Sequence, residues 1–290
     1  AKVPTLVVQL DDPPKERWEN VIKQCDTRRF DYKKQIAEVR NHVDSLLEGL
    51  PVDMRSTSPS LLGRFLRQCA LLFLAVACRL FFAYSEDVIA LAECCQVPIG
   101  ELFVANILYE VLGGCTSFVC ADKDDPQRRP LLGRTLDWPF VELDRYTAQF
   151  EWRDEGGVVF ESVGWLGYVG VMTGCRPGAL AVALNARYPD TKPYALAKAL
   201  GGALTGGGWI SGSIIRTVLQ AKDVDFNNAV EVLSQKKLLT PSYFIIAGSL
   251  PGEGMIVTRD LVAGPAAQTQ RRLHASCGYV VQTNSDFTEL

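Results

Sequence analysis

Cys115 is the residue of this sequence best suited to act as a nucleophile. It follows Gly113-Gly114 and precedes Thr116-Ser117, at a point where a helical sequence pattern gives way to strands and turns. The two glycines make the segment easy to bend and to present for cleavage. A cysteine nucleophile needs a neighbouring base or a stabilised thiolate. If the peptide bond before Cys115 is cut, the α-amino group of this residue can serve as that base.

Neither histidine has a motif that pairs it with this thiol. The chain has two histidines, of which His42 falls in an amphipathic helical pattern and His274 in an arginine-rich loop. The new amino group, with an unperturbed pKa of about 8, is therefore the simplest base available. The chain has nine cysteines, and buried apolar thiols account for most of them. The residues around Cys115, rather than the thiol alone, support the catalytic interpretation.

Arg134 and Asp137 follow the cysteine closely enough to act with it. Arg134 could hold the thiolate or a substrate carbonyl, and Asp137 could anchor the new ammonium group, although an ordinary surface ion pair explains them equally well. Their spacing of three places them on opposite faces of a regular strand. A bulge, or a strand end before Trp138-Pro139, is needed to turn both toward the thiol.

Two asparagines, Asn185 and Asn284, lie at the ends of predicted strands. Asparagine at such a position is usually a turn residue. A side-chain amide can also donate hydrogen bonds to the oxyanion that develops during acyl transfer. Both asparagines are therefore candidate site residues.

Composition excludes several other classes of function. A net charge of −3 without a basic tract gives no reason to expect nucleic-acid binding. The sequence has no CxxC pair, and its two histidines cannot complete a zinc set, so we expect no metal. The glycine-rich segment Gly201–Gly208 matches no phosphate-binding loop, and we expect no cofactor. The chain begins at Ala1 without a signal peptide, as a mature or trimmed form would.

The pattern of apolar residues divides the chain at Cys115. Residues 1–114 read as a strand at Val3–Leu10 followed by helices at 15–25, from 32 to about 51, at 61–84, at 85–95 (capped by Ser85) and at 98–112. Residues 115–290 read mainly as strands, at 116–120, 131–136, 147–152, 158–163, 168–173, 180–184, 243–248, 254–258 and 278–283. Helices at 195–203, 212–222 and 226–235 interrupt them, the last capped by Asp225. This order predicts an α+β fold with two antiparallel sheets and helices outside them.

Ten uninterrupted apolar residues, Cys69–Cys78, precede Arg79 in the helix predicted over 61–84. A membrane-spanning helix needs about 20 apolar residues, and Arg79 interrupts the run too early. The pattern favours a buried core helix. The alternative is a helix that rests on a membrane surface, with nearby arginines at the lipid head groups.

Several motifs, in this order, resemble the acid ceramidase and N-acylethanolamine acid amidase family. They are Leu10-Asp-Asp-Pro-Pro-Lys-Glu-Arg-Trp18, Pro98-Ile-Gly-Glu-Leu-Phe-Val-Ala-Asn106-Ile-Leu-Tyr109-Glu110, Gly113-Gly-Cys115-Thr-Ser-Phe-Val, Gly133-Arg-Thr-Leu-Asp137-Trp-Pro-Phe, Gly164-Trp-Leu-Gly-Tyr-Val-Gly-Val-Met-Thr-Gly174, Leu184-Asn185 and Gln282-Thr-Asn284. More distantly, the chain is similar to choloylglycine hydrolases and penicillin V acylases. The likeness spans nearly the whole chain.

The resemblance implies an αββα sandwich of the N-terminal-nucleophile hydrolases and a precursor that cuts itself before Cys115. A helical α-subunit, residues 1–114, and a catalytic β-subunit, residues 115–290, would then form a heterodimer. The thiolate would attack a fatty-acyl amide, such as an N-acylethanolamine or a ceramide-like lipid, in a lysosomal or other acidic, extracytoplasmic compartment. The helix at 61–84 would make peripheral membrane contact. Cys115, Arg134, Asp137 and Asn284 match the family's active-site positions, and Asn185 matches the oxyanion asparagine of the choloylglycine branch.

The chain departs from the family pattern at two points. Ala186 stands where the amidase and ceramidase branch has a glutamate, and Leu290 ends the chain before a further arginine of the family. Two alternatives follow. One is the same chemistry on a conjugated bile acid or a penicillin V side chain, and the other is a non-catalytic relative that binds lipid.

Overall fold

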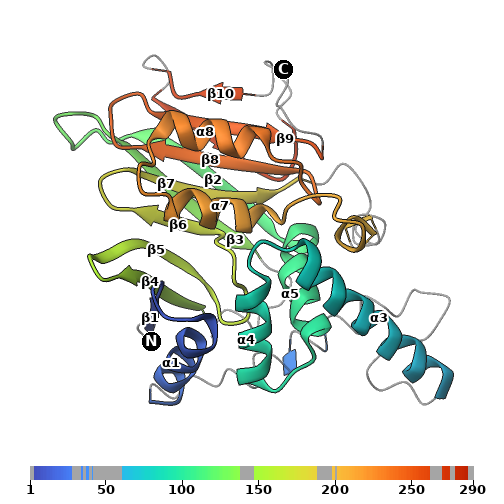
Figure 1. The fold of residues 1–290 in the computed structure, drawn as a ribbon. Coiled ribbons are helices and arrows are strands. Elements are labelled where there is room, and N and C mark those ends of the chain that lie inside the picture. Colours follow the sequence, from blue (N-terminus) through green and yellow to red (C-terminus); the bar gives the residue numbers. More distant parts are fainter. Residues whose placement is uncertain are drawn as a thin grey trace.

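Two stacked β-sheets, with helices on one side and at one end, form the protein (Figure 1). The computed structural model describes residues 3–27, 34, 37–38, 41, 61–137, 147–187, 198–199, 201–261, 270–274 and 278–286. The predicted α+β class with two sheets is confirmed. The predicted helix from 32 to about 51 lies largely outside the described residues. Of the helix predicted at 195–203, residues 198–199 and 201–203 are described, and they are helical.

The larger sheet has eight strands in the order β1-β4-β5-β6-β7-β8-β9-β10. All neighbouring pairs are antiparallel except the first, in which β1 (Thr5–Gln9) runs parallel to β4 (Thr147–Asp154). A strand from the N-terminal half therefore lies at the edge of a sheet built by the C-terminal half. The remaining strands are β5 (Gly157–Trp165), β6 (Thr173–Arg176), β7 (Leu180–Ala186), β8 (Ser242–Gly248), β9 (Gly254–Arg259) and β10 (Gln270–Arg272).

The smaller sheet has the order β11-β2-β3, with β11 at Tyr279–Gln282, β2 at Gly114–Ala121 and β3 at Pro130–Asp137. It packs on β7, β8 and β9 of the larger sheet. Side chains of β2 alternate as a half-buried strand requires, with Cys115, Ser117 and Val119 buried and Phe118 exposed. The buried face of β2 therefore meets the larger sheet. On the outer face, the apolar side chains of Phe118, Leu131, Tyr279 and Val281 are exposed.

Two helices cover the other face of the larger sheet. Helix α7 (Ser211–Gln220) packs on β5, β6 and β7, and α8 (Phe226–Gln235) packs on β8 and β9 (Figure 1). Asp225 caps α8 as predicted, because its side chain accepts a hydrogen bond of 2.8 Å from the main-chain nitrogen of Asn228.

The N-terminal helices gather at one end of the sheets. Helix α1 (Pro14–Thr27) packs on β1 and on α4 (Ser85–Cys95), while α3 (Leu61–Phe81) packs on α5 (Ile99–Leu112). Helix α5 leads through Gly113 directly into β2. The N-cap of α4 is Tyr84, and no side chain caps this helix, so the predicted cap by Ser85 is wrong.

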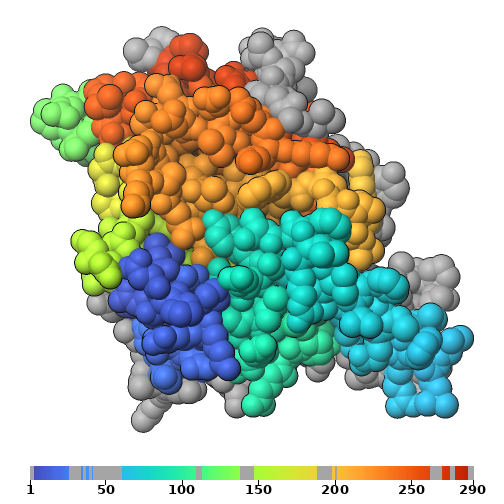
Figure 2. All heavy atoms as spheres, viewed as in Figure 1, coloured from blue at the N-terminus to red at the C-terminus, as the bar shows by residue number. Residues whose placement is uncertain are grey.

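Helix α3 is not the buried core helix that its sequence favours. It projects from the body of the protein (Figures 1 and 2). Leu72, Phe73 and Leu80 are 66%, 67% and 67% exposed. Its inner face is fixed to α5 by an ion pair between the buried Arg67 and Glu101. Helix α3 is long and apolar enough to cross a membrane, and about a third of its apolar segment is buried against the protein.

The segment 168–172 is a buried loop that leads into β6 at Thr173, so the strand predicted at 168–173 is wrong. Its main-chain groups bond to neighbouring elements instead of to a full strand ladder. The buried side chain of Asn106 in α5 donates to the carbonyl oxygen of Gly167 (2.8 Å) and accepts from the nitrogen of Val169 (2.9 Å). An apolar run bounded by glycines is common to buried strands and to such loops, so sequence pattern alone could not separate them.

A buried ion cluster joins the two halves of the chain. Asp87 of α4 accepts hydrogen bonds from Arg17 (2.8 Å) and Trp18 (2.6 Å) of α1 and from Arg216 (3.1 Å) of α7. Arg216, which is 1% exposed, also donates to the carbonyl oxygen of Val169 at 2.8 Å. Burial lowers the pKa of Arg216, and the charge of Asp87 opposes that effect. Asp87 therefore compensates two buried guanidinium groups at once.

We predict that Asp87→Ala lowers the free energy of unfolding by about 3–5 kcal/mol, because it leaves buried guanidinium groups without their carboxylate. Urea denaturation followed by tryptophan fluorescence measures the change. Asp125→Ala is the control, because it removes a carboxylate that pairs with an arginine at the surface. Equal stability of the two variants would contradict this account of the cluster.

Candidate active site

The main-chain nitrogen and the thiol of Cys115 contact polar side chains from elsewhere in the sequence. The Cys115 nitrogen donates a hydrogen bond of 2.7 Å to Oδ1 of Asn284, which is 169 residues away. The Cys115 sulfur accepts one of 3.2 Å from Nη2 of Arg134. The cysteine is 3% exposed and packs in the core between the sheets. In the continuous chain the thiol is thus surrounded by protein.

Arg134 reaches the thiol because of the register of β2 and β3. It pairs with Ser117, two residues beyond Cys115 on the same buried face of β2. Its Nη1 donates to the hydroxyl of Thr173 on β6 of the larger sheet at 2.9 Å. The guanidinium group is thus held between the two sheets, next to the sulfur. A cation at this position stabilises a thiolate.

Asn284 follows β11 and is held by the main chain on both sides of the site. Its Nδ2 donates to the carbonyl oxygens of Ala186 (2.6 Å) and Gly113 (3.3 Å), while its Oδ1 accepts from Cys115. One amide side chain therefore contacts the end of β7, the nucleophile itself and Gly113, which lies two residues before the nucleophile.

Asn185 lies between the sheets, and its amide is occupied. Its Nδ2 donates to the carbonyl oxygens of Gln282 (3.0 Å) and Thr283 (3.4 Å), and its Oδ1 accepts from the Ser117 hydroxyl at 2.6 Å. In this arrangement Asn185 ties β7 to β2 and to the end of β11. Its predicted role as an oxyanion donor stays a prediction.

Asp137 lies on the opposite face of β3 from Arg134. The β3 ladder continues without a bulge to Asp137, which pairs with Gly114 and is exposed. The bulge or early strand end that would turn both side chains toward the thiol is absent from this ladder. Since its ladder partner Gly114 precedes the predicted cleavage site, cutting there would remove the pairing that holds Asp137 in this position. Its role at the new amino group stays a prediction.

Sequence reasoning missed the contacts of Thr173 and Ser117. Thr173 supports Arg134, and although it lies within the motif Gly164–Gly174, nothing in that motif pairs it with Arg134. The Ser117 hydroxyl bonds to Asn185 and not to the sulfur. Both contacts cross between sheets, and such distant pairings leave no mark on local spacing.

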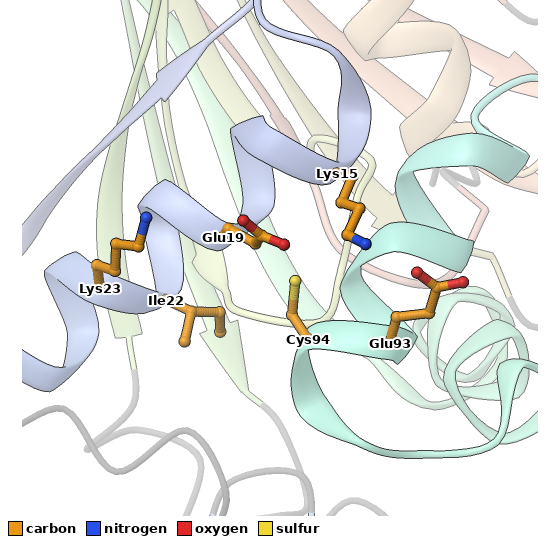
Figure 3. Close-up of a pocket in the computed structure, with 6 residues that line it drawn as sticks. All are labelled: Lys15, Glu19, Ile22, Lys23, Glu93 and Cys94. Atoms are coloured by element: carbon orange, nitrogen blue, oxygen red, sulfur yellow. The ribbon is translucent and has the colours of Figure 1, made fainter.

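A surface groove of about 380 Å³ lies between α1 and α4, away from the residues of the predicted site (Figure 3). Its lining includes charges of both signs and the thiol of Cys94, whose pKa is raised by burial. In the part of the chain that the structure describes, no group of three or more histidine, cysteine or carboxylate residues could hold a metal ion.

Comparison with known proteins shows which proteins this chain resembles. Residues 1–67 match the family model described as the beta subunit of N-acylethanolamine-hydrolyzing acid amidase. The acid ceramidase of Balaenoptera acutorostrata scammoni is 28% identical, over 98% of this chain and 70% of its own length. The human acid ceramidase is 27% identical over the same shares. The chain is thus similar to the acid ceramidases over nearly its whole length and to the N-acylethanolamine acid amidase model over its first 67 residues.

The fold agrees with this family. The solved structure of the Caenorhabditis elegans ortholog of N-acylethanolamine-hydrolyzing acid amidase superposes with a TM-score of 0.52 at 27% identity, covering 60% of this chain and 71% of that one. The resemblance to this family and the N-terminal-nucleophile hydrolase fold expected from the sequence motifs are confirmed. The sequence likeness covers nearly the whole chain, across both sides of Cys115.

We predict that Arg134→Gln slows the alkylation of Cys115 by iodoacetamide about tenfold at a fixed pH, because the thiolate loses its adjacent cation. Mass spectrometry of the Cys115 peptide measures the rate. Arg129→Gln serves as the control, since Arg129 pairs with Asp125 at the surface. Equal rates in the two variants would exclude a direct role for Arg134 at the sulfur.

Proposed function

We propose that this protein is a cysteine amidohydrolase that cleaves fatty-acyl amides and is activated by cutting its own chain between Gly114 and Cys115. The observation that carries the proposal is the double contact of Cys115. Its nitrogen bonds to Asn284 at 2.7 Å and its sulfur to Arg134 at 3.2 Å. A hydrolase with a catalytic N-terminus uses the nitrogen of its nucleophile as the base. It therefore requires that both the thiol and this nitrogen are held in position.

Self-cleavage would begin with attack of the Cys115 sulfur on the carbonyl carbon of Gly114. The Gly114–Cys115 amide bond breaks as a thioester forms, and the cysteine nitrogen takes a proton to become an amine. Water then hydrolyses the thioester, which gives a carboxylate on Gly114 and a free thiol on Cys115. Residues 1–114 and 115–290 become two subunits.

In the cut protein the amine of Cys115 takes the thiol proton, and the thiolate attacks the substrate amide carbonyl. The amine of the substrate leaves with a proton, and water hydrolyses the acyl-enzyme. In this step Asn284 would donate a hydrogen bond to the oxyanion, as its contacts indicate. One hydrogen of its Nδ2 binds Gly113 in the continuous chain. When that segment withdraws, this hydrogen becomes available to an oxyanion beside the thiol.

The substrate class follows from the relatives. The names of the matched proteins describe a ceramidase and an N-acylethanolamine-hydrolysing amidase, both active on amides of fatty acids. Both names also include the word acid, which supports an acidic compartment, with the lysosome as the finer proposal.

Incubation of the purified chain at acidic pH is expected to yield two fragments, residues 1–114 and 115–290, together with hydrolysis of palmitoylethanolamide or a short-chain ceramide. Intact mass spectrometry and release of fatty acid measure the two events. Cys115→Ala should stay whole and inactive, and Cys120→Ala, which alters a cysteine on the opposite face of the same strand, should behave as wild type.

The same assay separates the alternatives. If the cut chain hydrolyses only conjugated bile acids or penicillin V, its substrate is that of the choloylglycine hydrolases and penicillin V acylases instead. A chain that stays whole and hydrolyses none of these compounds would favour a non-catalytic lipid-binding relative. Ala186 replaces a glutamate of the amidase and ceramidase branch, and this departure is the reason to test for a non-catalytic protein. A chain that is active while whole would contradict the mechanism.

Helix α3 would bring the enzyme to its lipid substrate by peripheral contact with a membrane. The exposed apolar residues Leu61, Leu62, Phe65, Leu72, Phe73, Val76 and Leu80 recur at helical spacing and form one continuous stripe. A stripe of this kind can insert to a depth of about 5–10 Å at the boundary between head groups and acyl chains. The ion pair of Arg67 with Glu101 holds the opposite face on the protein.

We expect Leu72→Glu and Phe73→Glu each to weaken binding to phosphatidylserine-containing vesicles about tenfold, since burying such a side chain is worth about 1.5–3 kcal/mol. Sedimentation with the vesicles measures the bound fraction. Leu250→Glu alters an equally exposed leucine on the turn between β8 and β9 and should not change binding. Loss of binding in all three variants would argue against a specific role for α3.

A further inference from the structure

A second polar cluster lies directly behind Asn284. Asp286 is two residues after Asn284, and Arg187 is one residue after Ala186, whose carbonyl oxygen accepts from the Asn284 amide. The guanidinium group of Arg187 binds both carboxylate oxygens of Asp286, from Nε to Oδ1 and from Nη2 to Oδ2, each at 2.7 Å. Such a paired contact fixes orientation as well as distance.

A tyrosine completes the cluster. The hydroxyl of Tyr243 donates to Oδ1 of Asp286 at 2.6 Å, and the Tyr243 ring is 1% exposed. Arg187 also pairs with Asp260, which follows β9. The carboxylate of Asp286 is therefore held by two donors that belong to the larger sheet.

The strands give these donors a fixed position. Tyr243 on β8 pairs with Asn185 on β7, two residues before Arg187. The nitrogen of Arg187 donates to the carbonyl oxygen of Pro241, which continues the contact between the two strand ends. Asn284, in contrast, stands in the turn after β11 and not in a ladder. Its placement thus depends on side-chain bonds.

We propose that Arg187, Asp286 and Tyr243 form a clamp that positions the amide of Asn284 against the nitrogen of Cys115. They are positioning residues, because none of them contacts the thiol. The inference rests on the proposed function, since it assigns the clamp to the same reaction. Arg187, directly after β7, and Tyr243 on β8 bind Asp286 and so fix the turn after β11. The Asn284 side chain in this turn is thereby held between Ala186 and Cys115.

The charges of the clamp suit an acidic medium. Hydrogen bonds from Arg187, and then from Tyr243, lower the pKa of Asp286 despite partial burial. Burial, followed by the bond to Asp286, raises the pKa of Tyr243, so its hydroxyl remains a donor. The carboxylate of Asp286 can thus stay ionised and paired when exposed carboxylates begin to take up protons.

The experiment compares three clamp variants with two surface controls in the full-length chain. Arg187→Lys keeps the charge but loses the paired contact, Asp286→Asn keeps the shape, and Tyr243→Phe removes one hydroxyl and leaves the buried ring. Arg129→Lys and Asp125→Asn make the matching changes in a surface ion pair. Measured are the rate of self-cleavage at acidic pH, kcat and KM on palmitoylethanolamide, and the melting temperature.

The clamp predicts a fall of about tenfold or more in kcat and in the cleavage rate for Arg187→Lys and Asp286→Asn, since small misplacements near the reacting atoms are costly. KM should change less than about twofold, because the substrate does not touch these residues. Tyr243→Phe should show a smaller loss of the same kind. Both control variants should cleave and turn over as wild type.

Wild-type rates in Arg187→Lys and Tyr243→Phe would overturn the clamp while leaving the proposed function intact. A rise in KM at unchanged kcat would also overturn it, and so would a loss of activity that the melting temperature alone explains. A wild-type chain that neither cleaves nor hydrolyses would instead overturn the proposed function, and the inference with it. The two failures are thus distinguishable in one set of measurements.

Discussion

The hydrogen bond between the Cys115 nitrogen and the Asn284 side chain is the contact on which the arrangement of the site depends. It joins the first residue of the predicted catalytic half to a turn near the other end of the chain. Both sheets must be assembled before it can form, because β2 and β11 pair in one sheet and Ala186, which holds Asn284, ends a strand of the other. Under the proposed function, assembly of the sandwich would therefore precede self-cleavage at Cys115.

The two halves are joined by more than their covalent link. Asp87 receives one arginine from each half, and Asn106 of α5 holds both ends of the loop Gly167–Val169. These groups are buried, so separating the halves would break their ion pairs and hydrogen bonds and leave them without partners from the other half. Cutting one peptide bond would consequently change what Cys115 can do while most of the surrounding packing stays in place.

Local sequence patterns predicted the change from helices to strands at Cys115, the cap at Asp225 and the closing strands, because each depends on residues close in the chain. They could not predict the short strand β10, the loop at 168–172 or the partner of Asn185, which depend on contacts between distant segments. Strand periodicity did identify the conflict between Arg134 and Asp137, and the ladder places them on opposite faces. The exposed stripe of α3 has the same apolar composition as a core helix, so only the fold distinguishes the two.

The parallel pairing of β1 with β4 has a consequence for the protein after processing. β1 belongs to residues 1–114 and forms the outermost strand of the eight-stranded sheet. If this fragment dissociated, β4 would become an unprotected edge with open main-chain donors and acceptors, beside the aromatic side chains of Phe150 and Trp152. Exposed edges of this kind recruit other chains and lead to aggregation. The N-terminal fragment would thus cover the edge of the catalytic one, and its loss would favour aggregation.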